Sequence, residues 1–248
     1  MAMLAEETAR LNAIAGLYAD FTFDKLMRGY MLRRFRPHLP ARPEGRRALE
    51  MGCHHGAFSV LIEPLFEVLE VVDAADSFLT HTAARLSPRA ILHRALFESF
   101  EATPRFDAIF LSHVLEHLMD PVLVLSRARE WLAPGGRMLV AVPNGLAPSR
   151  QIAVEMGLIP GLAAFTEADI REGHRRVYLP DTLAADIRAA GLRIVDRGGV
   201  FFKPLANFQM DRGLEAGLIS EAYMEGCYQL GLRYPDLCAS LFVVAERA

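Results

Sequence analysis

One stretch of this sequence constrains the fold more than any other: a short apolar run that leads into two glycines. The run 48–51 (Ala-Leu-Glu-Met) has the character of a strand buried in a sheet. Gly52 and Gly56 follow it, and the apolar segment 57–62 then predicts a helix. Strand, glycine turn and helix open the βαβ unit that binds nucleotides, because glycine lets the backbone approach a ligand closely.

An acidic residue at the end of the next predicted strand fits this unit. The segment 68–72 is apolar except for Glu70, and Asp73 follows it, 21 positions after Gly52. A carboxylate in that place can hold both hydroxyls of a ribose. The dinucleotide fingerprint G-x-G-x-x-G would require glycines at 54 and 57, where this chain has His54 and Ala57. An NAD-dependent oxidoreductase therefore stays open only as an alternative.

A different glycine pattern fits better. The pattern [D/E]-x-G-x-G-x-G is matched by Glu50, Gly52 and Gly56 and is missed only at His54. This segment resembles the first motif of class I S-adenosylmethionine (SAM) dependent methyltransferases. Across roughly residues 45–200, the later motifs follow in the expected order. They are Asp73 at the second motif, Phe106–Leu118 at the fourth strand and Leu132–Asn144 at the fifth strand.

This resemblance implies the fold. We expect an α/β, Rossmann-like, doubly wound sheet of seven strands in the order 3-2-1-4-5-7-6. The seventh strand, near 239–245, should run antiparallel beside the fifth. The chain 1–248 is then a single methyltransferase domain, with a helical cap, a SAM-binding core and two insertions that enclose the acceptor. The predicted bounds are 1–44 for the cap, 45–143 for the core, and 144–178 and 204–235 for the insertions.

The resemblance also implies where SAM binds: across the loop that joins the two glycines, with ribose on Asp73 and adenine between Ala74 and the 96–97 segment. The predicted cofactor residues are Glu50, Gly52, Cys53, His54, Gly56, Asp73, Ala74, Leu96, Phe97, Ser112 and His113. His54 and Leu96 depart from the family pattern, which keeps a catalytically silent SAM-binding partner subunit as an alternative. A side chain at 54 is tolerable if φ is negative or the ring turns away from the ligand. We expect the ring to turn away.

The segment 113–117 also matches the H-x-x-E-H pattern of zinc peptidases. Such a site needs a third ligand on a following helix, and nothing before the fifth strand supplies it, so we predict no metal. For the transfer itself, we take His117 and His174 as candidate bases and Asn144, at the end of the fifth strand, as a third catalytic candidate. Each histidine is equally compatible with a structural role, and an amine acceptor can react without a base.

The composition of the chain limits the classes of partner that it is expected to bind. A net charge of -3 and a pI near 6.2 argue against a nucleic-acid partner. Three widely spaced cysteines imply neither a disulfide framework nor a zinc cluster. No apolar run reaches the length of a membrane span, and we see no signal peptide, so we expect a cytoplasmic protein without a membrane partner. Among the leading aromatic residues, Tyr18, Phe21, Phe23 and Tyr30 are candidate covers for the cofactor, although each one fits simple helix packing better.

Taken together, these features predict an enzyme that moves the SAM methyl group in line to a small-molecule acceptor and releases S-adenosylhomocysteine. Oxygen is our first choice of acceptor atom and nitrogen the second. The oligomeric state stays open, with a homodimer among the alternatives.

Overall fold

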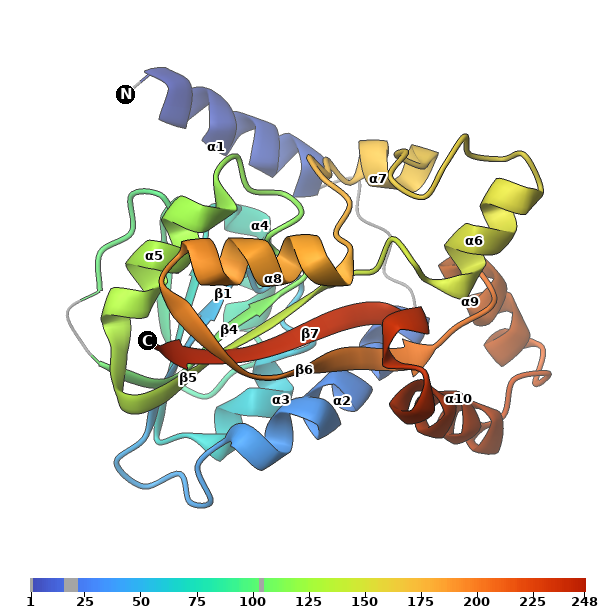
Figure 1. Ribbon diagram of the computed structural model, residues 1–248. Coiled ribbons are helices and arrows are strands. Elements are labelled where there is room, and N and C mark those ends of the chain that lie inside the picture. The colour runs from blue at the N-terminus through green and yellow to red at the C-terminus, as the bar shows by residue number, and fades with distance from the viewer. Residues whose placement is uncertain (1, 16–21, 103–104) are drawn as a thin grey trace.

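The computed structural model describes residues 2–15, 22–102 and 105–248, so Tyr18 and Phe21 lie outside the described residues. Figure 1 shows one layered α/β unit in which helices cover both faces of a single sheet. The elements in chain order are α1 (Ala2–Ala15), α2 (Thr22–Phe35), η1 (Arg36–His38), β1 (Arg47–Met51), α3 (Ser59–Ile62), η2 (Glu63–Leu65), β2 (Val68–Asp73), α4 (Asp76–Ala83), β3 (Ile91–Arg94), β4 (Phe106–Ser112), α5 (Pro121–Trp131), β5 (Leu132–Pro143), α6 (Pro148–Glu155), α7 (Glu167–Arg171), α8 (Pro180–Ala189), β6 (Leu192–Phe202), α9 (Asn207–Glu215), α10 (Glu221–Arg233), η3 (Pro235–Leu237) and β7 (Cys238–Arg247).

The sheet has the predicted order, β3-β2-β1-β4-β5-β7-β6. Strands β1 to β5 pair in parallel, and β7 runs antiparallel between β5 and β6. The Rossmann-like, doubly wound fold predicted from the sequence is thereby confirmed. Because β4 lies on one side of β1 while β2 and β3 lie on the other, the order of the strands reverses beside β1, where sheets of this type bind ligands.

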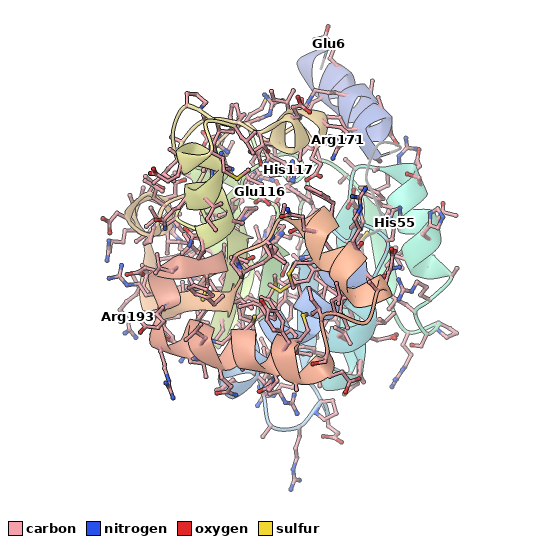
Figure 2. All side chains as sticks on the ribbon, turned by 90° about the vertical axis from the view of Figure 1, so that its right-hand side faces the viewer. Glu6, His55, Glu116, His117, Arg171 and Arg193 are labelled. Carbon is pink, nitrogen blue, oxygen red and sulfur yellow. The ribbon has the colours of Figure 1, made fainter. Side chains whose placement is uncertain are left out.

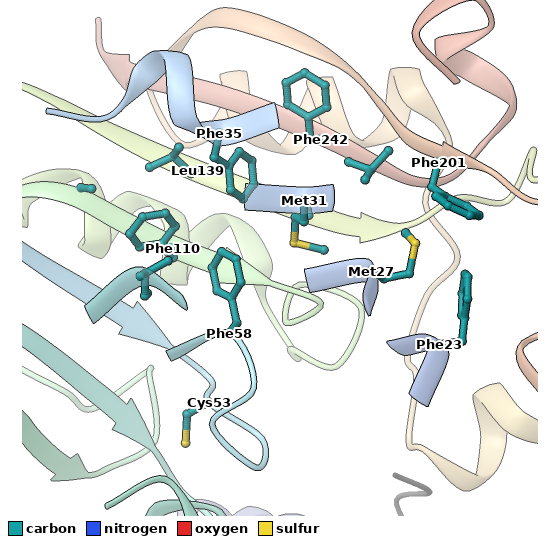
Figure 3. Packing of buried hydrophobic residues seen from close by; sticks show 14 of the residues in the cluster. Phe23, Met27, Met31, Phe35, Cys53, Phe58, Phe110, Leu139, Phe201 and Phe242 are labelled. Atoms are coloured by element: carbon teal, nitrogen blue, oxygen red, sulfur yellow. The ribbon is translucent and has the colours of Figure 1, made fainter. Parts of the chain in front are cut away.

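Two apolar cores lie on the two faces of the sheet. On one face, α2 and α3 pack through Phe35 and Phe58 against Phe110 of β4 and Phe242 of β7 (Figure 3). The rings of Phe35 and Phe242 meet edge to face, with centroids 6.2 Å apart. On the other face, α5 and α8 cover the sheet through a second cluster that includes Trp131. Strands covered on both faces explain the continuous apolar runs of the sequence.

The helix predicted over 57–62 is present as a single turn, Ser59–Ile62, because Pro64 follows and the chain continues as the 3-10 segment η2. The fifth strand begins at Leu132 and has more residues at its start than the facing part of β4. A register shift beside Phe106 accommodates the extra residues. Gly136 is required there, because a Cβ atom would lie 2.6 Å from the carbonyl oxygen of Phe106.

The leading and trailing helices pack on the sheet. The ring of Phe23 lies 5.5 Å from that of Phe201, and the ring of Tyr30 stacks on that of Tyr228 in α10 at 5.2 Å. These two aromatic side chains therefore take the simple packing role that we considered for them. Helices α9 and α10 are fixed on α2 and β6 by buried residues such as Met210. Within the described ranges, no helix is long and apolar enough to cross a membrane.

Candidate active site

The glycine loop after β1 needs both of its glycines for local reasons. Gly52 and Gly56 have φ values of +83° and +74°, which L side chains rarely adopt. A Cβ atom on Gly52 would also lie 2.7 Å from Cγ2 of Val114. On Gly56 it would lie 3.1 Å from the backbone of Thr82 in α4. The loop is therefore packed closely between the segments that follow β2 and β4.

Asp73 ties this loop to the end of β2. Its Oδ2 accepts a hydrogen bond from the backbone N–H of Cys53 at 3.0 Å, and its Oδ1 accepts one from the N–H of Ala75 at 2.9 Å. Burial raises the pKa of the Asp73 carboxyl, although these N–H groups act in the opposite direction. Burial and the neighbouring carboxylates also raise the pKa of the Cys53 thiol, which makes it unreactive as a nucleophile.

The segment after β3 provides an apolar surface beside the same loop. Leu96 and Ala74 are buried, and Phe97 is half-buried. The ring of Phe97 comes within 3.7 Å of the position that a Cβ atom on Gly52 would take. The predicted adenine-side residues and the glycine loop are thus close neighbours. The carbonyl oxygen of Leu96 is already engaged by the N–H groups of Ser99 and Phe100.

His54, the departure in the glycine pattern, adopts the left-handed conformation that glycine favours, with φ +49°. Its ring lies against the helix after β2, with centroids 4.9 Å from Phe78 and 4.1 Å from His55. The backbone carbonyl of His54 accepts a hydrogen bond from the Thr82 hydroxyl at 3.4 Å. The loop therefore keeps its shape at a cost in backbone strain, and the ring packs against Phe78 of α4.

Buried polar atoms lie at the ends of β1 and β4 and on α2, whose Arg28 acts electrostatically on Glu50. Oε2 of Glu50, Oγ of Ser112 and one terminal nitrogen of Arg28 are buried without a hydrogen-bond partner among the described residues. Burial raises the pKa of Glu50 to about 8, whereas the hydroxyl of Ser59 and, to a smaller extent, the positive charge of Arg28 oppose that shift. Buried polar groups are usually satisfied, so such a group of orphans indicates a place where a polar ligand belongs.

Arg28 was missed in the sequence. It lies on α2, far from every motif, and only the packing of α2 over the sheet brings its charge near Glu50 and His113. The available signal was weak: a single arginine inside an otherwise apolar helix turn.

His113 is fixed by the sheet. It has φ +58°, and its Nε2 lies 3.0 Å from the hydroxyl oxygen of Ser240 in β7. Its backbone N–H donates to the carbonyl oxygen of Ala141 at 2.8 Å. Burial lowers the pKa of His113 well below the ordinary value, so this ring is neutral. It lines the site as a hydrogen-bonding group and not as a charge.

Three further side chains gather beyond His113. One oxygen of Glu116 and one ring nitrogen each of His117 and His174 all lie within 4.8 Å of one another. The rings of His117 and His174 meet edge to face, with centroids 4.7 Å apart. Figure 2 shows Glu116 and His117 close together, on the side of the molecule where α1 and α7 lie. The two candidate bases from the sequence are thus brought together, although 57 positions separate them in the chain.

Hydrogen bonds from the insertion hold the turn that carries Glu116 and His117. The backbone N–H of Arg175 donates to the carbonyl oxygen of Glu116 at 2.7 Å, and its guanidinium donates to that of His117 at 3.0 Å. The guanidinium of Arg176 donates to the carbonyl oxygens of Leu115 and Leu118. Glu116 and His117 therefore stand in a clamped turn between β4 and α5, and not in the helix that a peptidase motif requires.

The protonation of the cluster follows from burial and charge. Burial raises the pKa of Glu116 to about 7 and lowers the pKa of His117 to about 3. Burial also acts to lower the pKa of His174, but hydrogen bonding to Asp169 and nearby carboxylates outweigh it, so the pKa is raised. His174 Nδ1 lies 2.9 Å from Asp169 Oδ1. His174 is therefore the more basic of the two rings.

Asn144 has a different role from the one expected. Its side-chain amide donates to the carbonyl oxygens of Asp236 and Cys238, both at 2.8 Å, and its Oδ1 accepts from the N–H of Leu146 at 2.9 Å. Both amide hydrogens are thus engaged by the backbone. Asn144 fixes the end of β5 against β7, and no donor of this side chain remains for a substrate.

Helix α1 lies beside this cluster, where it and α7 are neighbours (Figure 1). Glu7 accepts a hydrogen bond from the guanidinium of Arg175 at 2.9 Å. A Cβ atom on Gly173 would lie 2.7 Å from the side chain of Ile14. The side-chain oxygen of Asn12 accepts from the backbone N–H of Asp76 at 3.1 Å, so α1 spans from the insertion to α4.

Known proteins share both sequence and fold with this chain. A family model described as a methyltransferase domain matches residues 23–197. The chain is 31% identical over 177 residues to a ubiquinone biosynthesis O-methyltransferase of Rhizobium etli, covering 67% of this chain and 68% of that protein. It is 28% identical over 227 residues to the enzyme of that name from Sinorhizobium medicae, covering 81% and 87%.

Solved structures agree on the fold. A SAM-dependent methyltransferase from Mesorhizobium loti superposes with a TM-score of 0.62 at 16% identity, covering 88% of this chain and 98% of that one. The N-methyltransferase NodS from Bradyrhizobium japonicum, solved with S-adenosylhomocysteine, gives a TM-score of 0.57 at 16% identity, covering 92% and 89%. At this identity, the likeness concerns the fold alone.

Proposed function

The chain belongs to the SAM-dependent methyltransferase family, and from that premise we propose that it methylates a hydroxyl oxygen of a small-molecule acceptor. Family membership makes it an enzyme with SAM as its cofactor, in place of the NAD-dependent alternative. The choice of a small acceptor, and of oxygen before nitrogen, is supported by relatives that are named O-methyltransferases.

For the cofactor, we assign the loop Gly52–Gly56 to the methionine part of SAM, Asp73 to the ribose, and Ala74 with Leu96 and Phe97 to the adenine. The packing of these segments around Gly52 supports the assignment. Asp73 still has lone pairs to offer after accepting its two backbone hydrogen bonds, because each carboxylate oxygen carries two.

The orphaned polar atoms extend this assignment to the amino-acid end of SAM, which carries an ammonium and a carboxylate group. We assign the ammonium to the Glu50 side of the pocket and the carboxylate to Arg28. Cys53, His54, Ser112 and His113 complete the wall through backbone and side-chain contacts. The buried, unpartnered Glu50 oxygen and Arg28 nitrogen support this placement, because both need a ligand of opposite charge.

When bound, SAM supplies a methyl group that the sulfonium has already activated. The chain must therefore align the acceptor with it, exclude water and receive the acceptor's proton. Such alignment can supply up to roughly 7–11 kcal/mol of the barrier. The turn that carries Glu116 and His117 is held by hydrogen bonds from Arg175 and Arg176 of the insertion, which supports this role.

The observation that carries the choice of oxygen is the pairing of His174 with Asp169. A ring held at Nδ1 by a carboxylate presents Nε2 to an acceptor, and a base of this kind typically contributes about 10²- to 10⁴-fold in rate. In the metal-free chain, Nε2 of His174 would accept the proton of the acceptor hydroxyl, and bound SAM would supply the methyl group that this oxygen takes up. A neutral amine acceptor would not need this pair. His117 packs on His174 and helps to fix it.

A transfer assay with methyl-labelled SAM tests the proposal. We expect label to enter phenols and catechols in preference to matched primary amines, and His174→Gln to lose at least tenfold in that reaction. The exposed His81, changed to Gln, serves as the control. Label that enters amines only, at a rate independent of His174, would instead support N-methylation.

We also propose that the enzyme works in the cytoplasm on a dissolved acceptor, without nucleic acid. Its three cysteines are all unpaired and buried, which suits a reducing compartment. The net charge of -3 gives no attraction to phosphate backbones.

A further inference from the structure

The cluster of Glu116, His117 and His174 has a composition that proton transfer alone does not require. A base needs one ring and one orienting group, and His174 with Asp169 already provides them. Glu116 adds a carboxylate that is only 2% exposed, and neither of its oxygens has a hydrogen-bond partner among the described residues. A buried carboxylate in this state is costly unless a proton or a cation joins it.

The fold brings a third potential metal ligand to the segment 113–117, which the sequence pattern alone did not provide. Between the H-x-x-E-H segment and the fifth strand, the sequence offers no convincing third ligand. In the structure the first histidine, His113, turns away to Ser240, and the third group is His174, which the insertion returns from beyond β5. Two imidazoles and one carboxylate thereby converge from two separate segments.

The surroundings have the features of a metal site as well. A histidine ligand usually donates its second ring N–H to a carboxylate, which fixes the ring and its tautomer. His174 does so to Asp169, and Asp169 is itself held by the N–H of Thr166 at 2.8 Å and by Arg150 at 3.1 Å. Nε2 of His174 is thereby directed away from Asp169. Glu172 lies 3.8 Å from this nitrogen as a further oxygen donor at the edge of the cluster.

We infer that Glu116, His117 and His174 bind one divalent transition-metal ion, with zinc as the best fit. Two imidazoles and a carboxylate are the ligands of catalytic zinc sites, which keep a fourth position open. Magnesium is a poorer fit, because it prefers oxygen ligands. Bonds of about 2.0–2.2 Å to a tetrahedral ion would place the ligand atoms about 3.4 Å apart. The three atoms lie within 4.8 Å of one another, so small side-chain rotations suffice.

Binding of the ion does not depend on the proposed methyl transfer. A catalytic use of the ion would rest on the proposed function. An acceptor hydroxyl in the open coordination position would lose its proton more readily because of the ion's Lewis acidity. With the ion in place, His174 is a ligand and not a base, so the two roles can be separated by experiment.

The test measures metal binding without SAM or acceptor. The full-length protein is treated with a chelator, desalted and titrated with Zn²⁺ by calorimetry and with Co²⁺ by visible spectroscopy. We expect one equivalent of each to bind, and Co²⁺ to show the absorption of a four- or five-coordinate site with nitrogen ligands. Glu116→Gln and His174→Gln should each weaken binding at least tenfold. His81→Gln and Glu155→Gln, both exposed and outside the cluster, should not change it.

Two measurements guard against misfolding. Retained SAM binding shows that each variant is folded, and Zn²⁺ should raise the melting temperature of the wild type but not of Glu116→Gln. If neither variant folds, the wild type decides: Zn²⁺ must protect His117 and His174 from modification by diethyl pyrocarbonate.

The inference is overturned if wild-type protein binds less than one equivalent, if the Co²⁺ spectrum is that of the hexa-aqua ion, or if the cluster variants bind as the wild type does. Loss of methyl transfer with metal binding intact would count against the proposed function alone.

Discussion

The carboxylate of Asp73 accepts a hydrogen bond from the backbone N–H of Cys53 at 3.0 Å, so the acid at the end of β2 and the glycine loop after β1 form one unit. Neighbouring parallel strands bring these two segments together, since Met51 pairs with Val72. The acid thus has two tasks: it shapes the loop, and it faces the ribose in our assignment. A substitution should affect both.

Asp73→Ala should therefore weaken SAM binding at least tenfold. Hydrogen bonds to a charged group are worth roughly 1.5–3 kcal/mol each, and the variant loses those to the ribose as well as the tie to the loop. Isothermal titration with SAM measures the effect, with Asp76→Ala on the surface of α4 as the matched control. A dissociation constant equal to that of the wild type would mean that Asp73 is not the ribose anchor.

His54→Gly should keep SAM binding within a few-fold. Glycine relieves the strained φ of +49°, while the loss of the ring's contact with Phe78 and the freer unfolded chain act against it. Side-by-side titrations of the wild type and the variant measure the difference. If SAM binds more than tenfold tighter to the variant, the imidazole competes with the methionine end of the ligand, and the silent-subunit reading gains support.

Arg28→Gln should also weaken SAM binding about tenfold or more, because it removes the positive partner that we assign to the SAM carboxylate. The same change should leave affinity for adenosine, which lacks that carboxylate, nearly unaltered. Lys25→Gln, on the exposed side of α2, is the control. Equal losses for SAM and adenosine would point to a general disturbance of α2 and not to a carboxylate contact.

Glu50 should make stability depend on pH. Its folded-state pKa of about 8 lies above the ordinary 4.5, so between these values the folded chain binds more protons than the unfolded one. Stability therefore falls as pH rises through this window, by an amount on the order of a few kcal/mol at most. Urea unfolding at pH 5.5 and 8.5 measures the loss in the SAM-free protein. In Glu50→Gln the loss should be smaller, whereas equal losses would show that Glu50 is already charged when folded.

The parts of this molecule that could be predicted from sequence are those that depend on local pattern. Apolar runs such as Val68–Asp73 have strand periodicity and length, and Gly52 and Gly56 occupy backbone conformations that other residues avoid, so fold and cofactor loop were both recognisable. Asn144 shows the limit of that reasoning. Its position at the end of β5 is that of a catalytic residue, but its hydrogen bonds to η3 and β7 depend on a strand that returns about 90 residues later.

The same limit explains why the acceptor side, and the Arg28 contact that we assign to SAM, could not be derived from the sequence. Arg28 and His174 lie on a leading helix and in an insertion, where no periodic pattern specifies which way a side chain points. Their positions follow from long-range contacts, for example those of Arg175 with the turn at Glu116. Local propensity does not contain such contacts, so His174 could be named as reactive but not joined to Asp169.

The pair formed by Asp169 and His174 allows a last prediction, because a carboxylate can orient either a base or a metal ligand. Asp169→Asn keeps the shape of the side chain and removes its charge. We expect the rate of methyl transfer to fall about 10- to 100-fold, as for other carboxylates behind a working histidine, while SAM affinity stays unchanged. Asp181→Asn, on the exposed start of α8, is the control. Rates are measured with a saturating phenolic acceptor, once after chelation and once with added Zn²⁺.

If His174 works as a base, the chelated wild type is fully active and Zn²⁺ does not restore the variant. If the cluster works through an ion, chelation abolishes activity in the wild type and excess Zn²⁺ restores much of the variant's rate, because weaker binding is overcome by concentration. An unchanged rate in Asp169→Asn under both conditions would show that the carboxylate only caps α7 with Thr166, as its other hydrogen bonds already do.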